Sequence, residues 1–373
     1  MNQVSAADIA SWAALEARAI EPNAYLSPYF VLPATRHLTR NSGTLALIVE
    51  RSGPAPREMV GVGIFEKARP SRHFPVPRLT GYRSRHSLLG GVLLDRDCHA
   101  EALRAMLHHL RSALPWCQGL EFAGAWADGP LLQDARAAES SGAFMAVFQD
   151  AVARAILRPA NCPALLLDKR LSGRLREMNR KKRRLEERGR VLWRWHRDDG
   201  IADTVVERFL ALEHMGWKGA SGSSLRANPG DELFFREMVQ GFASERRALF
   251  TELLLDDQAI ASTCTFISGR VGFSFKIGWD PAFKVFALGI LNEIEMMRQA
   301  HLAFSGIDYF DSGASPESFI NDLWLERRQL GSLLIPVRTM GACALRFAGY
   351  TRRIRDILRP AASPVADPVK AET

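Results

Sequence analysis

The sequence predicts a mixed α/β protein of two related domains, each with a central mixed sheet flanked by helices. Three observations support this prediction. The chain has 373 residues, enough for two domains of about 100–200 residues each. Short β-branched runs alternate along it with segments whose apolar residues follow a helical period. The order of these segments in residues 1–160 is a shorter version of their order in 161–345, although no sequence repeat is evident.

The composition is that of a globular protein with substantial cores. Hydrophobic residues make up 47% of the chain and charged residues 24%. No apolar run approaches the ~20 residues that a membrane-spanning helix needs, and residues 1–22 lack the basic start of a signal peptide. The five cysteines are scattered without C-x-x-C spacing. We therefore expect a cytoplasmic protein with reduced thiols and no metal site.

The first domain, residues 1–160, is expected to contain a hairpin, a strand, a helix and a further strand after a short N-terminal helix. Apolar β-branched runs on both sides of a turn-like SGPAPRE segment predict the hairpin, and apolar residues at helical spacing predict the helix. The expected elements are the helix 1–20, strands 44–51 and 59–68, strand 87–95, helix 99–114 and strand 119–126.

The second domain, residues 161–345, is expected to start with a helix that Ser172 caps and Gly189 ends. Turn residues divide 247–280 into three consecutive strands. The other expected elements are strand 191–197, helices 203–217 and 230–244, helix 288–306, strand 307–313, helix 316–329 and strand 332–338. Residues 346–373 are expected to form a basic helix to about Leu358 and a disordered tail.

The positive charge of the chain is concentrated in one segment. Residues 174–190 contain nine Lys or Arg against three Glu, a net charge of +6, whereas the whole chain carries +8. Leu171, Leu175, Met178 and Leu185 form an apolar stripe that would pack inward, leaving a positive outer face. That face is either simply solvated or binds an anionic donor, tRNA or a membrane surface, and such binding would weaken with salt.

Several enzyme templates are excluded. The segment GASGS at 219–223 is not a G-x-S-x-G elbow, and GVGIFE at 61–66 lacks the third glycine of a dinucleotide-binding turn. No G-x-x-x-x-G-K-[S/T] phosphate loop is present. His108 and His109 are adjacent, so they diverge on a helix and make a poor metal pair.

Four motifs in residues 170–340 together resemble a known family. They are the basic helix MNRKKRRLEERG before a strand, the segment LEHMGWKG, the strand FSFKIGWDPAF followed by a helix that opens at Gly289, and DYFDSG followed by Trp324. The element order and these motifs resemble the GNAT acyltransferase fold. The residue pattern is similar to the double-GNAT branch with CelD-like proteins of cellulose biosynthesis and, more distantly, the FemAB-type peptidyltransferases.

This resemblance implies transfer of an acyl group from acyl-CoA to an amine or hydroxyl, with the site in the second domain. The entry to the helix at Ala287, Leu288, Gly289 and Ile290 would bind the diphosphate of CoA, because the first N–H groups of a helix lack partners. The segment departs from the family pattern, since it has only Gly289, with Leu288 where this branch often has proline. A tight strand-to-helix turn is the alternative.

Three residues around the Gly/Ser-rich loop 219–228 are candidate site residues. Glu213 is a candidate general base for the attacking amine. Trp217 would stack on the substrate or close the core at a helix end, and Lys218 would bind substrate or complement the helix dipole. The loop itself would act as a mobile lid.

Four further residues of the second domain are candidates. Alternation within FSFKIGW places Lys276 opposite Phe275 and Ile277, where it would hold a substrate carboxylate or phosphate or face solvent. Asp280 would contact substrate or start a turn. Asp311 lies near the end of its strand, where ligands of α/β sheets bind, or caps the next helix. Trp324 would bind substrate or lie in the core.

The sequence therefore predicts an acyltransferase in which the acceptor attacks a thioester directly while backbone N–H groups polarise its carbonyl. The acceptor would belong to envelope polysaccharide or lipid assembly, an extension that follows from the resemblance. One alternative is a FemAB-like enzyme that takes its donor from aminoacyl-tRNA, which the basic helix would suit. The other is a non-catalytic module that binds nucleic acid through 174–190, although no aromatic RNA-binding motif supports it.

Overall fold

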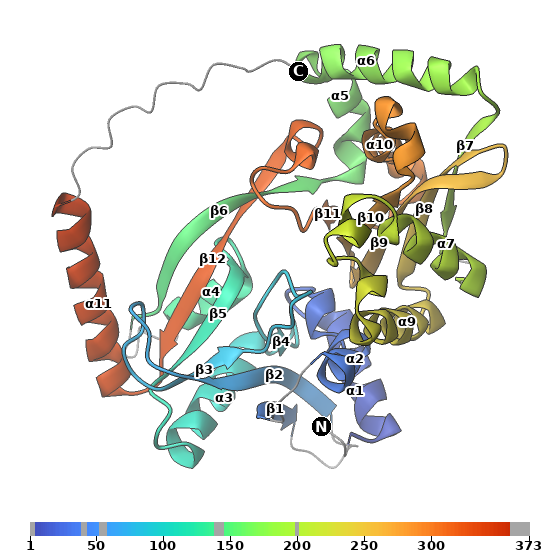
Figure 1. Cartoon of the computed structure of the whole chain (residues 1–373). Helices are drawn as coiled ribbons and strands as arrows, with labels where there is room; N and C mark the ends of the chain where they lie inside the picture. Colours follow the sequence, from blue (N-terminus) through green and yellow to red (C-terminus); the bar gives the residue numbers. More distant parts are fainter. Residues whose placement is uncertain (1–3, 39–42, 52–57, 138–144, 198–200, 359–373) are drawn as a thin grey trace.

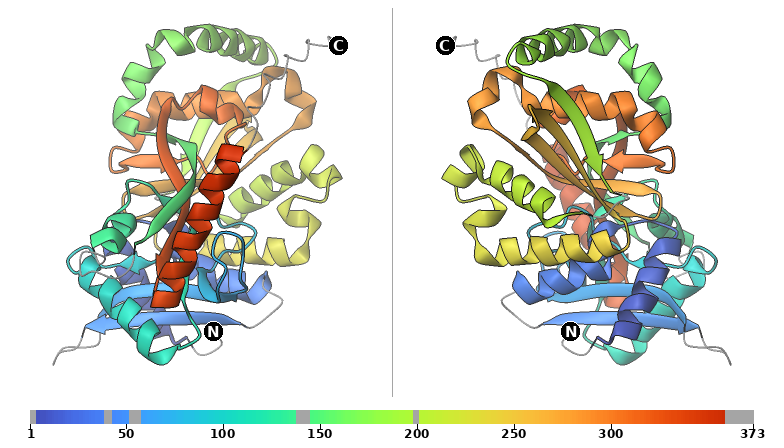
Figure 2. Two further views of the ribbon diagram at one scale, coloured as in Figure 1. Left: turned by 90° about the vertical axis from the view of Figure 1, so that its left-hand side faces the viewer. Right: turned by 90° about the vertical axis from the view of Figure 1, so that its right-hand side faces the viewer.

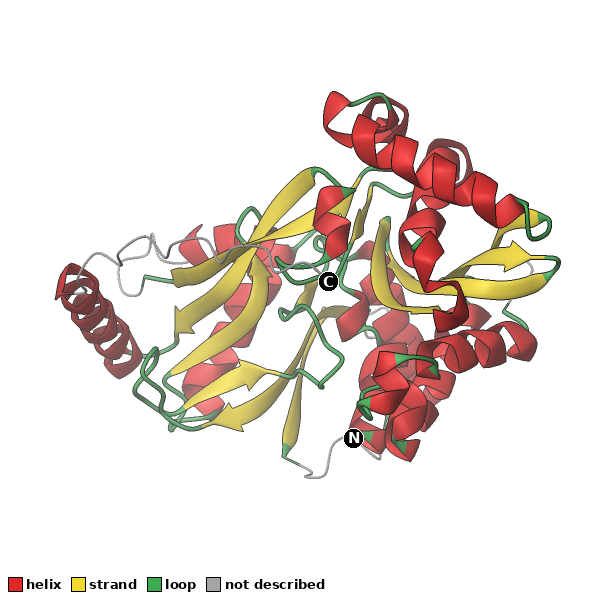
Figure 3. Cartoon of the chain, turned by 45° about the horizontal axis from the view of Figure 1, so that its top comes forward, coloured by secondary structure: helices red, strands yellow, loops and turns green. Residues whose placement is uncertain are grey.

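The computed structural model of the chain describes residues 4–38, 43–51, 58–137, 145–197 and 201–358. In these ranges it confirms the mixed α/β class, with helices packed on both faces of one large sheet (Figure 1, Figure 3). The turn expected in the first hairpin and the tail expected after Leu358 lie outside the described residues.

The strands of the described residues form one 12-stranded sheet, in the order β1-β2-β3-β5-β12-β6-β11-β10-β9-β8-β7 with β4 paired to β2. Their bounds are β1 Thr44–Arg51, β2 Glu58–Ala68, β3 Arg78–Gly81, β4 Leu93–Leu94, β5 Gly119–Trp126, β6 Val147–Leu157, β7 Val191–His196, β8 Ala248–Leu255, β9 Gln258–Ser268, β10 Val271–Trp279, β11 Tyr309–Asp311 and β12 Glu326–Pro336. The predicted hairpin is confirmed as the antiparallel pair of β1 and β2. The three predicted consecutive strands are confirmed as antiparallel β8, β9 and β10.

The helices cover the sheet from both sides (Figure 2). Their bounds are α1 Ala6–Arg18, α2 Pro28–His37, α3 His99–Ala113, α4 Pro130–Ala137, α5 Cys162–Leu166, α6 Lys169–Glu186, α7 Asp203–His214, α8 Trp217–Ala220, α9 Pro229–Ser244, α10 Leu288–Ala303 and α11 Thr339–Leu358. Short 3-10 helices include η3 Leu225–Ala227, η4 Pro281–Phe286 and η5 Phe319–Asp322. Alternate residues of β9 enter two different cores: Cys264 and Phe266 pack with α7 and α9, whereas Ala261 and Ile267 pack with α6 and α10.

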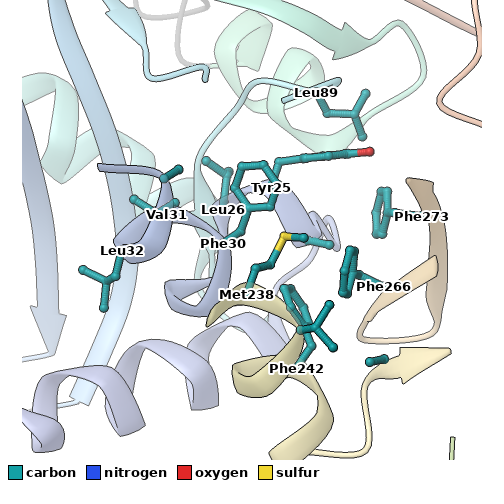
Figure 4. Packing of buried hydrophobic residues seen from close by; sticks show 14 of the residues in the cluster. Tyr25, Leu26, Phe30, Val31, Leu32, Leu89, Met238, Phe242, Phe266 and Phe273 are labelled. Carbon is teal, nitrogen blue, oxygen red and sulfur yellow. The ribbon is translucent and has the colours of Figure 1, made fainter. Parts of the chain in front are cut away.

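One of these cores is shared by the two halves of the chain (Figure 4). α2 packs against α9, and the rings of Phe30 and Phe234 meet edge to face with centroids 5.2 Å apart. Tyr25 meets Phe273 of β10 in the same way at 5.8 Å. Apolar area buried across this contact holds the first half of the chain firmly against the sheet that carries the candidate site.

The basic helix is confirmed but begins earlier than predicted. Asp168 caps it by accepting the N–H of Arg170 at 2.8 Å, whereas the hydroxyl of Ser172 donates to the carbonyl of Lys169. An aspartate is as good an N-cap as a serine, and the helix therefore starts at Lys169. Leu171, Met178 and Leu185 of the predicted stripe are buried.

Two predicted elements are wrong. The strand expected over 87–95 is reduced to Leu93–Leu94, and the helix expected over 316–329 is replaced by η5 and the start of β12. β12 is antiparallel to both β5 and β6, which come from the first 160 residues. These long-range ladders override the local helical pattern of this segment. The domain division at residue 160 stays a prediction.

Strands β10 and β11 pair over only three residues. Val271–Phe273 pairs in parallel with Tyr309–Asp311, and beyond this point β11 ends while β10 continues to Trp279. The two chains therefore separate towards the C-terminal end of β10. In the same region Gly278 lets β10 approach α7, because a Cβ on Gly278 would lie 2.4 Å from the backbone nitrogen of Glu213.

Candidate active site

A cavity of about 280 Å³ lies where β10 and β11 separate. Ser274 to Ile277 of β10 form one wall, and Ser312 to Ala314 after β11 form the facing wall. Lys218 of α8, Thr263 of β9 and Glu293 of α10 also line it, as do residues 318–320 and Trp324. The cavity thus brings polar groups from six separate segments to one gap in the sheet.

Glu213, Lys218 and Lys276 form a buried charged cluster at this cavity. The carboxylate of Glu213 is fully buried, and its Oε1 lies 3.6 Å from Nζ of Lys218 and 3.8 Å from Nζ of Lys276. Its Oε2 accepts the backbone N–H of Leu225 at 2.8 Å, which fixes the 219–228 loop at η3. Two cations thus share one carboxylate, and the cluster carries a net positive charge.

Burial shapes the chemistry of Lys218. Its Nζ donates a hydrogen bond of 2.6 Å to the carbonyl of Ile277 on β10. Burial lowers its pKa, an effect that the charge of Lys276 reinforces and that of Glu213 opposes. An ammonium group with a lowered pKa gives up a proton more readily than an exposed lysine does.

A bulge in β10 corrects the predicted facing of Lys276. The pairing of β10 with β9 shifts register between Ser274 and Lys276, so strict alternation is interrupted at Phe275. As a result Nζ of Lys276 lies only 5.9 Å from the centroid of the Phe275 ring, instead of on the opposite face. Ile277 resumes the ladder opposite Thr263, which also lines the cavity.

Glu293 is a cavity residue that the sequence reasoning missed. Burial raises its pKa to about 7, and the hydroxyl of Thr263 donates to its Oε1 at 3.3 Å. Within the described residues, its Oε2 has no hydrogen-bond partner. The sequence held a signal, since Glu293 sits between Leu291 and Ile294 on a helix whose neighbouring positions are buried. A carboxyl group with a pKa near neutrality is suited to general acid–base catalysis.

The amide of Asn292 supports this wall of the cavity. It donates to the hydroxyls of Thr251 at 3.1 Å and Thr263 at 3.0 Å, and its oxygen accepts the indole N–H of Trp193 at 2.9 Å. Because every polar group of this side chain is satisfied, the position of Thr263 next to Glu293 is well defined.

Trp324 lines the cavity, whereas two predicted acidic residues lie outside its lining. Asp311 is buried and binds Nη1 of Arg154 at 3.2 Å and the N–H of Gly313 at 3.0 Å. Burial raises its pKa against the opposing effect of Arg154. Asp280 caps η4 by accepting the N–H of Ala282 at 2.9 Å. The side chain of Trp217 lies outside what the structure describes.

The start of α10 lies beside the cavity. Ala287 is in the left-handed region with φ 53°, and the buried Leu288 begins the helix. A Cβ on Gly289 would lie 3.2 Å from Cδ1 of Ile277, a lining residue, and Ile290 follows within the first turn. Of the four residues predicted to bind CoA, Gly289 is therefore next to the cavity wall, and their binding of CoA stays a prediction.

Comparison with known proteins finds a family match to one segment of the chain. Residues 172–319 match the model of the acetyltransferase (GNAT) domain family. This segment has the GNAT fold. No curated protein sequence matches the chain. The match covers the charged cluster, α10 and the cavity lining except Ile320 and Trp324, and it does not include β12.

Solved structures similar in fold span nearly the whole chain. FemX is 10% identical, with 89% of this chain and 96% of FemX covered at a TM-score of 0.56. A conserved protein of unknown function from Bacteroides thetaiotaomicron is 11% identical, with 90% of this chain and 98% of that protein covered at a TM-score of 0.57. The C-terminal domain of a protein assigned as a lysylphosphatidylglycerol synthetase from Agrobacterium fabrum is 10% identical. The alignment covers 93% of this chain and 96% of that domain at a TM-score of 0.54. At such identities the likeness concerns the fold alone.

The basic helix α6 lies along the GNAT cavity's α10 wall. Lys182 pairs with Glu295 of α10 at 2.9 Å, and Arg174 pairs with Asp322 of η5 at 2.9 Å. Four arginines of its outer face are not ion-paired within the described residues, namely Arg176, Arg180, Arg183 and Arg184, although the helix also carries an exposed pair of Lys181 with Glu177. A positive stripe is therefore exposed on the helix that packs against α10 and η5.

The described residues contain no helix that is long and apolar enough to cross a membrane. Among those same residues, no group of three or more His, Cys, Asp or Glu side chains is arranged to hold a metal ion.

Proposed function

We propose that this chain is an acyltransferase that moves an acyl group from acyl-CoA to an amine or hydroxyl acceptor. The observation that carries the proposal is the cavity at the separation of β10 and β11, with a net positive cluster on one side and Glu293 on the other. An opening in a sheet with both a fixed cation and a carboxyl of pKa about 7 combines the two groups that acyl transfer needs.

In the proposed reaction, each charged residue of the cavity has a separate role. As the acceptor attacks the thioester carbonyl, the N–H or O–H proton passes to Glu293, and the C–S bond then breaks. The departing thiolate takes a proton from Lys218, whose lowered pKa favours this step. Lys276 stabilises the negative charge that develops on the carbonyl oxygen. We assign Glu213 to balance the two lysines, since it lies buried between them.

The other predicted residues take supporting roles in this proposal. In the first turn of α10, the backbone N–H groups of Leu288 and Gly289 would bind the CoA diphosphate next to the cavity wall, since those of Ala287 and Ile290 already donate to the carbonyls of Lys284 and Ala287. Asp311 would orient the wall through its hydrogen bond to Gly313, and Asp280 would hold η4 at the entry to α10. Trp324 would contact the acyl chain. Trp217 stays a predicted acceptor-binding residue.

The resemblance to CelD-like proteins favours an acceptor from envelope polysaccharide or lipid assembly. One second candidate function has a specific observation in its favour. The exposed arginine stripe of α6 would suit a donor carried on tRNA, as in FemAB-like peptidyltransferases. In that case the aminoacyl ester would occupy the same cavity, Glu293 would still take the proton of the acceptor, and Lys276 would still stabilise the charge on the carbonyl oxygen.

Titration with acetyl-CoA and long-chain acyl-CoAs, followed by tryptophan fluorescence, tests the proposal. Trp324 lines the cavity and Trp279 ends β10, so a bound acyl group should change the emission. No change at any chain length would contradict the CoA donor, and salt-sensitive retention of aminoacyl-tRNA would then favour the second candidate.

Two substitutions separate catalysis from folding. Glu293→Gln should lower kcat by about 100-fold or more, because a positioned general base contributes about that factor. Lys276→Met should lower kcat by a similar factor through loss of charge stabilisation. Lys181→Met on the outer face of α6 is the matched control and should keep full activity with CoA donors. If Glu293→Gln and the control are equally active, the assignment of the base is wrong.

A further inference from the structure

A second and larger hollow lies at the opposite end of β10 and β11 from the cavity. Its volume is about 810 Å³, and the end of α1, the β9–β10 turn, the start of β11 and β12 border it. Val271 lines this groove and Ile277 lines the cavity. Ser274 is the cavity residue of β10 nearest to Val271, so at about 3.3 Å per strand residue the linings of the two sites are about 10 Å apart along this strand.

The groove is lined by seven arginines and four acidic side chains, a net charge of +3. Arg270 and Arg328 pair with Asp308 and Asp128 of the wall itself. Two more arginines pair with carboxylates outside the wall, namely Arg158 with Glu326 and Arg247 with Glu16. With these two included, six carboxylates face the seven arginines, so a net charge of +1 remains.

Arg246 provides unneutralised charge at the rim. It is exposed, and it has no ion pair among the residues that the structure describes. Its φ of 55° places it in the left-handed region, which is rare for an arginine. Within the described residues, the guanidinium of Arg96, which is also exposed, donates to the backbone carbonyls of Ala17 and Arg18 and has no ion pair. The guanidinium groups of Arg246 and Arg96 can therefore each form an ion pair with an anionic group of a ligand.

Arg328 is rigidly held at the floor of the groove. Its guanidinium carbon lies 4.2 Å from the centroid of Trp126 and 5.2 Å from that of Tyr309, so two rings support the planar group. Asp128 binds it at 2.6 Å, and it donates to the hydroxyl of Tyr309. A guanidinium fixed in this way loses little side-chain entropy when it binds an anion.

Glu21 adds a carboxyl group beside this arginine. Burial raises its pKa to about 7, against the opposing charge of Arg328. Its Oε2 has no hydrogen-bond partner among the described residues. Gly129 leaves room for it, since a Cβ there would lie 2.4 Å from that oxygen. A carboxyl at this position can accept a hydrogen bond from a ligand hydroxyl or, when protonated, donate one.

We propose that this groove binds a small anionic sugar, in which Arg246 and Arg328 hold a phosphate and the acidic wall residues accept hydrogen bonds from hydroxyls. Arginine forks match phosphate oxygens, whereas Glu21 and Asp128 would repel a second negative charge. The mixed wall therefore fits a sugar phosphate better than nucleic acid. A sugar carboxylate shares this chemistry. The proposal is independent of acyl transfer, because the groove is separated from the cavity.

Calorimetric titration of the full chain with glucose 6-phosphate tests this site. Glucose, inorganic phosphate and glucuronate are titrated in parallel. Arg246→Ala and Arg328→Lys should each weaken binding of glucose 6-phosphate by about tenfold or more, as expected for loss of one charge-assisted contact or of its fork geometry. Arg176→Ala on α6 is the control and should change the Kd by less than about twofold.

The outcomes are distinct. Tight glucose 6-phosphate binding with weak glucose and inorganic phosphate binding supports the proposal, and tight glucuronate binding identifies a sugar carboxylate as the ligand. Inorganic phosphate that binds as tightly as glucose 6-phosphate would show a simple anion site and overturn the proposal. So would a lack of heat with both anionic sugars, or equal weakening in the control. Acetyl-CoA binding should persist in Arg246→Ala, so failure of this site and failure of acyl transfer are distinguishable.

Discussion

Replacing Glu213 by glutamine removes the negative charge that lies between two lysines. Oε1 of Glu213 is 3.6 and 3.8 Å from the two ammonium groups, and its side chain is fully buried. At about 4 Å and an effective dielectric constant of about 20, each pair is worth about 4 kcal/mol before desolvation is subtracted. Removing one member of a buried pair costs about 3–5 kcal/mol. Because Lys218 and Lys276 retain about a fifth of their exposure, we expect Glu213→Gln to lose about 2–3 kcal/mol.

Urea denaturation followed by circular dichroism at pH 7 measures this loss. Glu207→Gln on the same helix is the control, because Glu207 forms surface pairs with Arg226 and Arg236 and should lose less than about 1 kcal/mol. Adding Lys276→Met to Glu213→Gln should restore part of the stability, since one uncompensated cation is removed. If Glu213→Gln costs no more than the control, the cluster does not hold β10 against α7.

Three further changes test other parts of the structure. The pKa of Glu293 is raised from 4.5 to about 7, so the folded protein keeps a proton that the unfolded protein loses, and stability falls as the pH rises through this window. In Glu293→Gln the loss of stability between pH 4.5 and 8 should be smaller by about 3 kcal/mol. A pH profile of stability that is the same in Glu293→Gln and the unaltered protein would refute the shift. Gly278→Ala should lower the unfolding free energy by about 1–3 kcal/mol, because its Cβ would lie 2.4 Å from the backbone of Glu213, whereas Gly173→Ala, with open space around it, should be neutral or stabilising. Arg180→Glu should elute from heparin at lower salt with an unchanged melting temperature, and an unchanged elution would show that the stripe of α6 does not bind polyanions.

The elements that the sequence predicted best depend on local information. The β1–β2 hairpin and the β8–β9–β10 meander join neighbouring segments through short turns, and both were confirmed. The position of β12 between β5 and β6 depends on pairing with strands about 170–210 residues earlier in the chain, which no local period records. Its apolar spacing suited a helix over 316–329, and only the sheet decides that residues from Glu326 onward are extended.

The sequence identified individual residues of the candidate site, but it did not predict which of them lie close together. Glu213, Lys218 and Lys276 were each singled out, but their contact depends on the close approach of β10 and α7 at Gly278. The bulge at Phe275 left no sequence signature, so the predicted facing of Lys276 was wrong relative to Phe275, whereas Lys276 and Ile277 still alternate along the ladder. Glu293 could have been found as a carboxyl at a buried helical position.

A structure of the chain with a non-hydrolysable acyl-CoA analogue tests the central claim most directly. The proposal predicts that the acyl carbonyl lies in the gap between β10 and β11, within contact of Lys276 and Glu293, with the diphosphate at the first turn of α10. An analogue bound in the arginine-lined groove instead, or a gap that stays without ligand at saturating concentration, would contradict acyl transfer from CoA at this site.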